Sequence, residues 1–402
     1  MTRPIAACVV VLSSALVLAA CGSNGSSPTS TSTSSSASPT GSPTSSTSPS
    51  PTSTTPSPTP SSVFRFVGDG LERPGFQDVL ASDASGNVIV GAVRTKSDVT
   101  GVDVGLVFST DAGDTWAWGG TLKLAGEQVP RGIMITPQGA VIVGETRAGE
   151  ADPEAFIAAA AAPDFDLFAV PLPAQFAGSV SLRDIALVKG EWVIVGLGRD
   201  DTSFATLLWQ SSDQGDTWKR KAVALPEVMA PSQLAVGPDG AWNIVGATQK
   251  SAAWARSEDQ GLSWSYVQPA AFADGDNATQ FIMSANNVVG VLGSQGDKVA
   301  VWASNAQGAM TRMPLPDPSV QAIAFQGEDF VAAGSPGNDR IQFWSLEAGA
   351  WKETTSIPGT KGGIFLDQLI SDGAGVVAIG NTWTTESDRN IGIWKGTLIP
   401  PV

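Results

Sequence analysis

The sequence predicts an all-β fold, a seven-bladed β-propeller closed into a ring by a strand near the start of the chain. Three observations predict it. A short apolar strand that ends in glycine recurs seven times. An octet of the form Ser-x-Asp-x-Gly-x-Thr/Ser-Trp recurs in three good copies. A lone apolar segment, Val63–Val67, precedes the first repeat. The repeats predict the number of blades, and the lone segment is expected to close the ring.

The recurring apolar strand sets the number of blades. Each copy follows a shorter apolar strand and a turn, and each precedes a third strand, as in Leu207-Leu-Trp209. Strands buried on both faces between neighbouring blades are expected to be continuously apolar, and these are. The terminal glycines stand 41–53 residues apart, which is the length of one four-stranded blade: Gly91, Gly144, Gly196, Gly246, Gly293, Gly334 and Gly380.

The octets predict the turn from a third strand to a fourth. They are Ser109–Trp116, Ser211–Trp218 and Ser257–Trp264. The Asp carboxylate can accept backbone N–H groups of a tight turn, and the Gly supplies the positive φ that the turn requires. The Trp then begins the outgoing strand by burying a large ring. The residues expected to form these turns are Asp111, Gly113, Trp116, Asp213, Gly215, Trp218, Asp259, Gly261 and Trp264.

The two ends of the repeat region are complementary. The seventh repeat ends at Lys395-Gly-Thr-Leu-Ile399 with no octet and no fourth strand, whereas Val63–Val67 has no inner strand of its own. We therefore expect Val63–Val67 to pair as the outer strand of the last blade. Such a closure removes the open sheet edges that would otherwise invite aggregation.

The octets resemble the Asp-box, also called the bacterial neuraminidase repeat, of sialidase-like β-propellers. In that family the box lies at the blade periphery, so the resemblance implies an architecture and not an activity. Sialidases of the family clamp the substrate carboxylate with three arginines and use a tyrosine nucleophile paired with a glutamate. Here the only tyrosine, Tyr266, follows the box residue Trp264 on an expected outer strand. The family's Arg-Ile-Pro signature is absent as well.

The first residues are expected to direct export. Arg3 precedes an apolar run, Ile5–Ala20, which is short for a membrane span. The sequence Leu18-Ala-Ala-Cys21 resembles the lipobox of bacterial lipoproteins. That resemblance implies a signal peptide over 1–20, diacylglycerol on the Cys21 thiol and acylation of the new amino terminus. It places the protein on the extracytoplasmic face of the cell membrane. An ordinary secretory signal with a chance cysteine is the alternative.

A tether and one large domain are expected to follow. Residues 21–62 begin with Cys21 and are then almost entirely Ser, Thr, Pro and Gly, without charge. Such a segment cannot bury enough surface to offset its ordering entropy, so we expect a disordered linker. The propeller is expected to occupy 63–402.

Composition excludes several classes of function. The net charge of −15 disfavours nucleic acid as a partner. Histidine is absent, which removes Ser-His-Asp triads and His-ligated metals. Both cysteines, Cys8 and Cys21, precede the expected domain, so it has no disulfide and no thiol nucleophile. We expect no cofactor and no metal.

Equivalent positions of the repeats suggest a binding site. If the repeats align without gaps, the position thirteen residues before each glycine is polar in every blade: Asp78, Arg131, Arg183, Gln233, Gln280, Gln321 and Asp367. Three residues after the glycine stand Arg94, Arg147 and Arg199 in the first three blades. These positions face one rim, so five arginines are expected to converge there: Arg94, Arg131, Arg147, Arg183 and Arg199. Guanidinium groups suit carboxylate, sulfate or phosphate.

Two interpretations of the arginines stay open. They can form an anion-binding site, or they can be paired with nearby acids: Glu145, Asp184, Asp200 or Asp201. We expect a monomeric, membrane-anchored recognition or scaffolding module that binds an extracytoplasmic protein or glycan without catalysis. The alternative is a sialidase-like or other glycoside hydrolase acting on anionic glycans, with Asp78 and Asp367 as neighbouring carboxylates across the closure.

Overall fold

The structure is a computed structural model that describes residues 64–398 except 74, 98–100, 148–152, 177–179, 201–202, 268–270, 306–308, 360–361, 372–374 and 386–387. The expected signal peptide over 1–20, Cys21 and the linker over 21–62 lie outside the described residues. Among the described residues, no helix has the length and apolar character needed to cross a membrane.

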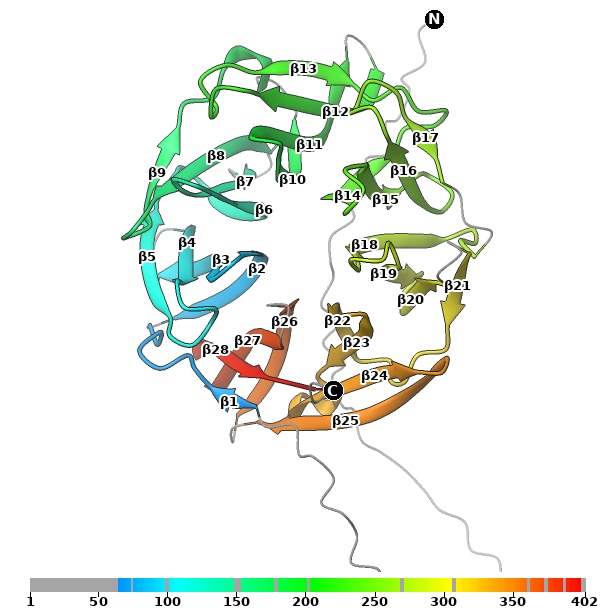
Figure 1. Ribbon diagram of the computed structural model, residues 1–402. Coiled ribbons are helices and arrows are strands. Elements are labelled where there is room, and N and C mark those ends of the chain that lie inside the picture. The colour runs from blue at the N-terminus through cyan, green and yellow to red at the C-terminus, as the bar shows by residue number, and fades with distance from the viewer. Residues whose placement is uncertain are drawn as a thin grey trace, which may run out of the picture. The chain divides into compact units, whose positions relative to one another are not determined.

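The propeller is a ring of seven four-stranded antiparallel sheets, as predicted (Figure 1). The innermost strands are β2 (Phe76–Ser85), β6 (Glu127–Thr136), β10 (Ser181–Val188), β14 (Ala230–Val236), β18 (Asp276–Met283), β22 (Val320–Gln326) and β26 (Gly363–Ser371). The second strands are β3 (Val88–Ser97), β7 (Gly139–Arg147), β11 (Glu191–Asp200), β15 (Trp242–Ala247), β19 (Val289–Gln295), β23 (Asp329–Gly334) and β27 (Val376–Thr385).

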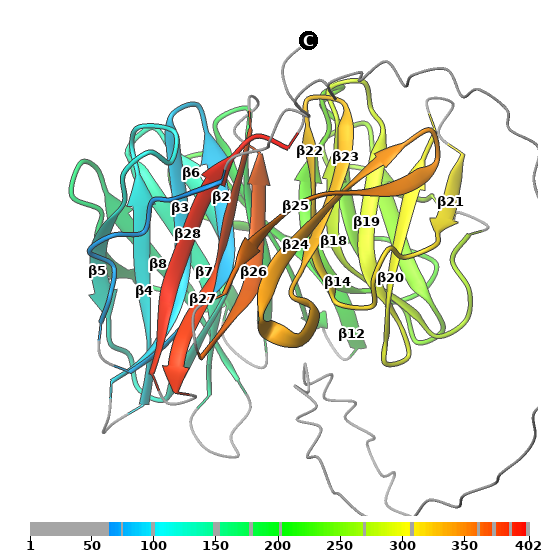
Figure 2. The ribbon, with the colours of Figure 1, turned by 90° about the horizontal axis from the view of Figure 1, so that it is seen from below.

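Third and outer strands complete each blade (Figure 2). The third strands are β4 (Gly101–Ser109), β8 (Glu154–Ala161), β12 (Ser203–Ser211), β16 (Ala252–Ser257), β20 (Lys298–Ser304), β24 (Arg340–Glu347) and β28 (Asp388–Gly396). The outer strands are β5 (Ala117–Leu122), β9 (Asp166–Val170), β13 (Lys219–Ala222), β17 (Ser265–Tyr266), β21 (Met310–Met313), β25 (Ala350–Pro358) and, in the seventh blade, β1 (Arg65–Phe66). Two short 3-10 helices, η1 (Ala174–Phe176) and η2 (Pro336–Asn338), lie in connections.

The ring closes as the sequence predicts. β1 pairs antiparallel with β28, with Phe66 opposite Trp394, and the N–H of Val67 donates to the carbonyl of Ile393 at 2.9 Å. The rings of Phe66 and Trp394 meet edge to face, with centroids 5.8 Å apart. Figure 1 shows β1 beside β28 at the edge of the seventh blade. The closure therefore combines backbone pairing with aromatic packing.

The octet turns have the predicted hydrogen bonds. In the third blade Asp213 accepts the backbone N–H of Thr217 at 2.8 Å and the Thr217 hydroxyl at 2.5 Å. The Ser211 hydroxyl donates to the same carboxylate and accepts the N–H of Gly215, each at 2.8 Å. Gly215 has φ +94°, which only glycine adopts without strain. The buried Trp218 precedes β13 and donates to the Gly215 carbonyl at 3.0 Å.

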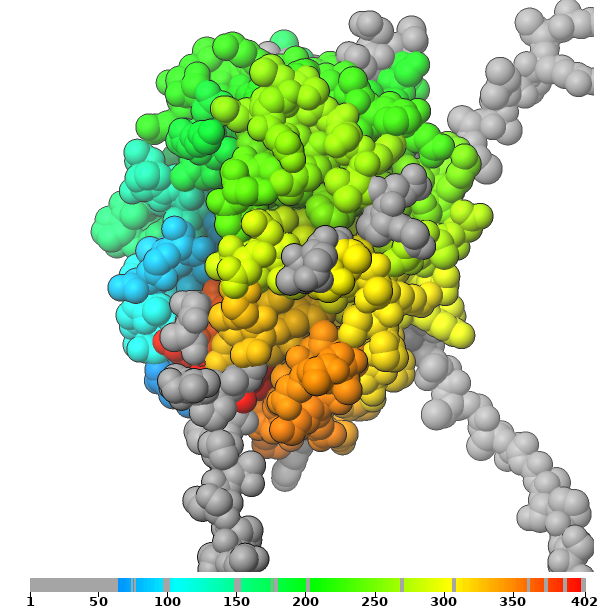
Figure 3. Space-filling model, turned by 45° about the vertical axis from the view of Figure 1, so that its right-hand side comes forward, coloured from blue at the N-terminus to red at the C-terminus, as the bar shows by residue number. Residues whose placement is uncertain are grey.

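The hydrophobic core lies between blades. Buried side chains form seven clusters, each drawn from two neighbouring sheets. Between the second and third blades, for example, Ile157 packs with Leu182 and Trp209, and Phe176 stacks on Trp209 with ring centroids 5.1 Å apart. Figure 3 shows successive blades packed side by side on the outer surface. Each blade is therefore stabilised by both of its neighbours.

The gapless alignment of the repeats is wrong by one residue in the fourth and fifth blades, where Gly246 and Gly293 lie opposite residues fifteen positions earlier instead of fourteen. It is wrong by two residues in the first blade. Gly91 lies opposite Ser82, whereas Gly144 of the second blade lies opposite Pro130. The reason is that the β2–β3 hairpin closes at Val88, so Gly91 is two residues nearer to its turn than Gly144 is. Leu80 therefore occupies the position of Arg131, and Asp78 lies two residues closer to the rim.

Candidate functional site

Every innermost strand carries a β-bulge. In the second and third blades the extra residues are Arg131 and Arg183. A bulge leaves one residue out of the ladder and turns its side chain in a new direction. The predicted polar position thus coincides with the bulge in these two blades.

Three arginines gather around one buried carboxylate. Arg131 and Arg147 both donate to Oε1 of Glu145, at 2.6 and 2.5 Å. The Ser181 hydroxyl, at the start of β10, donates to Oε2 at 2.8 Å. The Glu145 side chain is only 2 % exposed, whereas Arg131 is 28 % and Arg147 is 44 % exposed. We call Arg131, Arg147, Arg183 and Glu145 the arginine cluster.

Attraction between the Glu145 carboxylate and the guanidinium groups stabilises the arginine cluster. Burial alone would raise the pKa of Glu145, but the charge and hydrogen bond of Arg131, the Ser181 hydroxyl and the charge of Arg183 outweigh it and lower this pKa to about 2. Burial lowers the pKa of Arg183, and the charges of Arg131 and Arg147 lower it further, against the opposing charge of Glu145. One carboxylate thus faces three guanidinium groups, which leaves two positive charges in excess.

The other two predicted arginines lie apart from the cluster. Arg94 donates to Asp78 at 2.7 Å and lies 3.7 Å from Glu127, so two acids offset its charge. Arg199 is exposed, and its guanidinium lies over the ring of Phe204 at 5.3 Å. Of the five, therefore, the structure brings Arg131, Arg147 and Arg183 together.

Arg389 on β28 was missed by the sequence comparison. Its guanidinium lies 4.0 Å from Asp78 and 5.4 Å from the centre of the Trp383 ring. Trp383 stands three residues after Gly380, and Arg389 is its partner in the β27–β28 register. The comparison covered only the first two strands of each blade, so a residue at the start of a third strand escaped it.

The remaining polar residues of the innermost strands connect neighbouring blades. Gln233 accepts the N–H of Phe281 at 2.5 Å, and Gln280 exchanges two hydrogen bonds with the backbone of Ile323. Carboxylates do the same elsewhere: Asp83 accepts from Ile135 at 2.7 Å, Asp184 from Leu234 at 2.8 Å and Asp367 from Val79 at 3.3 Å. We call these side chains the blade clips.

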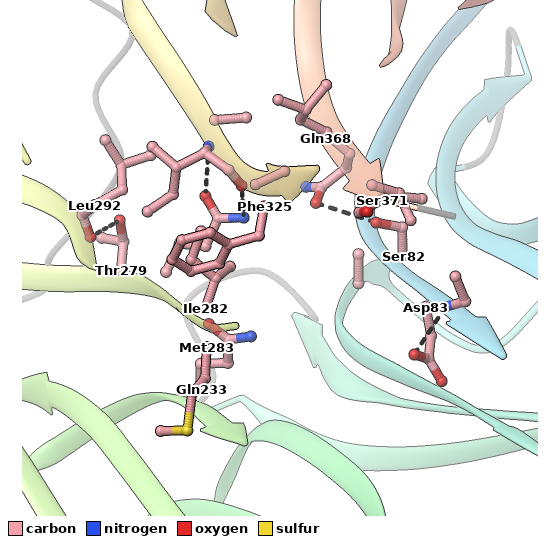
Figure 4. A pocket seen from close by; sticks show the side chains of 18 of the residues that line it. Ser82, Asp83, Gln233, Thr279, Ile282, Met283, Leu292, Phe325, Gln368 and Ser371 are labelled. Carbon is pink, nitrogen blue, oxygen red and sulfur yellow. Dashed lines mark hydrogen bonds between the residues drawn. The ribbon is translucent and has the colours of Figure 1, made fainter. Parts of the chain in front are cut away.

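The blade clips line a central cavity of about 910 Å³. Figure 4 shows part of it, with Gln233, Gln368 and Asp83 from different blades facing the same space. Arg131, Asp184 and Asp367 also line it. Burial raises the pKa of Asp184 to about 7, and burial followed by the charge of Asp78 raises the pKa of Asp367 well above its ordinary value.

Tyr266 is placed apart from this cavity. The hydroxyl of Tyr266, on the outer strand β17, donates to the carbonyl of Glu227 at 2.6 Å. Within the described residues, no cluster of three or more His, Cys, Asp or Glu side chains could hold a metal.

No protein-family model matches the chain. No curated protein matches it either. Several solved structures do resemble the chain. YCF48 bound to D1 peptide has a TM-score of 0.54 and 15% identity, over 83% of this chain and 96% of that one. The polysaccharide lyase Uly1 has a TM-score of 0.55 and 12% identity, over 80% and 90%. The Trypanosoma rangeli sialidase in complex with sialic acid has a TM-score of 0.45 and 10% identity, over 85% and 57%.

These similarities concern the fold. At such low identity, the two structures with the higher TM-scores show that the chain shares their β-propeller architecture. Their names describe a protein that binds a peptide and an enzyme that acts on a polysaccharide, so one architecture carries different functions. The function of this chain has to be argued from its own residues.

Proposed function

We propose that the protein is an exported lipoprotein whose propeller recognises an anionic group on an extracytoplasmic partner, without catalysis of its own. The arginine cluster is the observation that carries this proposal. Three guanidinium groups share one buried carboxylate on a chain of net charge −15. Guanidinium groups bind carboxylate, sulfate and phosphate in bidentate fashion, so the excess charge suits one further anionic group.

The open side of the cluster supports this function. Arg147 stands at the end of β7, opposite Glu127 at the start of β6, so the cluster lies at the rim where these strands meet. The guanidinium of Arg183 makes no hydrogen bond to any described residue, and its Coulombic partners are the other members of the cluster. An incoming anion could therefore gain hydrogen bonds from Arg183 without displacing Glu145.

A protein partner is the favoured ligand. YCF48, which has the same architecture, is seen bound to a peptide, and this supports a peptide as the molecule that carries the anionic group. Anchoring through Cys21 would hold the propeller near membrane proteins.

The anchor has its own test: the wild-type protein should partition into the detergent phase of a cell extract, and Cys21→Ser should release it. Detergent partitioning of the Cys21→Ser variant would contradict the anchor.

Two features speak against a sialidase mechanism. The only tyrosine, Tyr266, is engaged on an outer strand, remote in the blade from the innermost strands that carry Arg131 and Arg183. The Arg-Ile-Pro signature of that family is also absent from the sequence.

A glycoside hydrolase is the second candidate function. Burial, followed by the charge of Asp78, raises the pKa of Asp367 well above its ordinary value, while Arg94 pairs with Asp78. Two carboxyl groups in such different surroundings are what glycosidases use. Hydrolysis of an anionic glycan that is lost in Asp78→Asn and retained in Arg183→Gln would favour this function over recognition.

The recognition function is tested by ligand-induced stabilisation of the full-length protein in detergent. A panel of carboxylated, sulfated and phosphorylated peptides and sugars should include an anion that raises the melting temperature. A ligand at about a hundred times its dissociation constant adds about 2.7 kcal/mol, which is a shift of a few degrees. Arg183→Gln should remove the shift. Arg199→Ala, which changes an arginine outside the cluster, should retain it. No shift with any anion would refute the proposal.

A further inference from the structure

The central cavity adjoins the arginine cluster. Arg131 belongs to both, because its guanidinium pairs with Glu145 at 2.6 Å and its side chain lines the cavity. From the level of the bulges, the cavity extends along the innermost strands to the ends of β18 and β26, where Ser284 and Ser371 line it. Its volume of about 910 Å³ lies in the range of about 300–1,000 Å³ that is typical of ligand-binding cavities. A molecule held at the cluster therefore has room to continue along the axis of the ring.

Three side chains from the second, fourth and sixth blades offer N–H donors to this cavity. Arg131 uses one terminal nitrogen for Glu145, and its other terminal nitrogen makes no hydrogen bond to a described residue. Gln233 uses its Oε1 to accept the N–H of Phe281, which leaves its Nε2 without a partner among the described residues. Gln321 makes no side-chain hydrogen bond within the part of the chain that the structure describes. Its Oε1 is buried, so its Nε2 is the end of the amide that can face the cavity.

The bulges of the innermost strands bring these donors to one level of the ring. Arg131 and Gln321 are the extra residues of the bulges in β6 and β22. Gln233 directly follows the extra residue of the bulge in β14. A bulge turns its side chains away from the regular alternation of a strand, here toward the cavity. Figure 4 shows Gln233 facing the open space.

The rest of the lining is mixed in character. The carboxyl groups of Asp184 and Asp367 accept backbone N–H groups of the next blade and keep further lone pairs. Ile282, Met283 and Phe325 add apolar surface (Figure 4). The cavity thus combines N–H donors, oxygen acceptors and apolar side chains. A peptide matches this combination, because each residue carries a C=O and an N–H group and its side chain can be apolar.

We propose that the central cavity binds a short peptide segment that continues from the anionic group at the arginine cluster, with backbone carbonyls of the segment accepting hydrogen bonds from Arg131, Gln233 and Gln321. The inference rests on the proposed function, because it names the molecule that carries the anionic group. A chain cannot be laid into a closed ring from the side, so the segment enters along the axis as an end of the partner chain. The acidic side chain should therefore stand within a few residues of that end.

Small probes of equal charge separate the cavity from the arginine cluster. The capped peptide acetyl-Ala-Asp-Ala-Ala-amide carries one carboxylate on a chain of amide groups. Acetate carries the carboxylate alone, and glucuronate carries it on a ring of hydroxyl groups. Their affinities for the full-length protein in non-ionic detergent are measured by NMR titration at neutral pH. We expect the peptide to bind more tightly than acetate, on the order of tenfold, because it adds hydrogen bonds in the cavity.

A substitution in the cavity assigns the added affinity. Gln321→Leu removes one donor and changes the size of the side chain little. It should weaken binding of the peptide, on the order of 2- to 10-fold, and leave the affinity for acetate unchanged. Gln138→Leu is the matched control, because Gln138 is exposed in the turn between β6 and β7. The control should change neither affinity.

Side-chain amide resonances provide a measurement that needs no substitution. In the wild-type protein, the Nε2–H signals of Gln233 and Gln321 should shift when the peptide is added and stay in place when acetate is added. Gln280 is an internal control, because both ends of its amide are bonded to the backbone of Ile323. If Gln321→Leu does not fold, as judged by circular dichroism, these signals decide the test.

The outcomes separate the cavity from the recognition function. A peptide that binds no more tightly than acetate and shifts neither amide signal would overturn the role of the cavity and leave the recognition site in place. Glucuronate that binds as tightly as the peptide, with the same loss in Gln321→Leu, would overturn the assignment to a peptide. Peptide binding that is weakened in Gln321→Leu but retained in Arg183→Gln would support the cavity and refute recognition by the arginine cluster. If none of the probes binds, both proposals fail.

Discussion

The carboxylate of Asp184 in the third blade accepts the backbone N–H of Leu234 in the fourth blade at 2.8 Å. Three of the blade clips, Asp83, Asp184 and Asp367, are carboxylates, and no salt bridge among the described residues pairs Asp184 with a cation. Gln233 performs the same task for Phe281 without any charge. The difference between these two clips makes the stability of the ring depend on pH.

We expect the protein to lose stability as the pH rises through neutrality. The pKa of Asp184 in the folded protein is about 7, raised from 3.8, so its contribution is fully present below about pH 4 and is lost as the pH rises through about 7. The loss should be on the order of 2–4 kcal/mol, since one pKa unit corresponds to about 1.4 kcal/mol. Urea unfolding between about pH 5 and about pH 8.5 measures it. Asp184→Asn should flatten the profile, and a wild-type stability that rises over this range would contradict the assignment.

The contribution of the arginine cluster to stability has the opposite dependence on pH. The pKa of Glu145 is lowered from 4.5 to about 2, so its contribution is present above about pH 4.5 and is lost as the pH falls through about 2. Glu145→Gln keeps the shape of the side chain and removes its charge. We expect this variant to bind an anion more tightly, on the order of 5- to 10-fold. It should also be less stable by about 1–3 kcal/mol, because two charge-assisted hydrogen bonds weaken.

Anion titration and urea unfolding of Glu145→Gln test the expected gain in anion affinity and the expected loss of stability. Glu154→Gln is a suitable control, because Glu154 is an exposed carboxylate at the start of β8. It should change neither property. An anion affinity that falls in Glu145→Gln would mean that Glu145 orients the arginines for the ligand and does not compete with it.

The repeats made most of the fold predictable. The terminal glycines fixed seven blades because each second strand must be apolar on both faces. Val63–Val67 could be assigned to the seventh blade because that blade lacked a fourth strand. The register was predicted less well: the first hairpin is two residues shorter between Gly91 and its turn, and the fourth and fifth blades are displaced by one residue. Hairpin length depends on turn geometry, to which apolar periodicity is insensitive.

The site was harder to predict for a related reason. The sequence comparison found Arg131 and Arg183 because bulges recur at the same place in successive blades. It could not separate Arg94 from them, since pairing with Asp78 and Glu127 depends on the register of the first blade. The clip function of Asp184 could not be predicted either, because it depends on a hydrogen bond to Leu234 of the next repeat.

The octet turns should contribute to stability through their aspartates. Asp213→Ala removes the acceptor for the Thr217 N–H and hydroxyl groups, and we expect the melting temperature to fall by a few degrees. Asp216→Ala is the control, because Asp216 lies in the same turn and only its backbone is hydrogen-bonded there. It should leave the melting temperature unchanged. Equal effects of the two substitutions would show that the carboxylate of Asp213 is not what holds the turn.

The last test concerns the closure of the ring. Deleting residues 390–402 removes most of β28 and with it the partner of β1 and a share of the interface between the seventh and first blades. β27 would then become an open edge that exposes apolar side chains such as Ile379. We expect the truncated protein to lose cooperative unfolding and to aggregate.

A shorter deletion and a point substitution separate closure from chain length. Removing only 399–402 spares β28 and should leave the melting curve unchanged. Trp394→Ala keeps the backbone pairing but removes a buried ring that packs against Phe66, so a loss of about 3–5 kcal/mol is expected. Because β28 is the strand with which β1 pairs, this loss should be accompanied by faster amide exchange at Val67, whose N–H donates to Ile393. Unchanged exchange at Val67 in this variant would show that backbone pairing alone closes the ring.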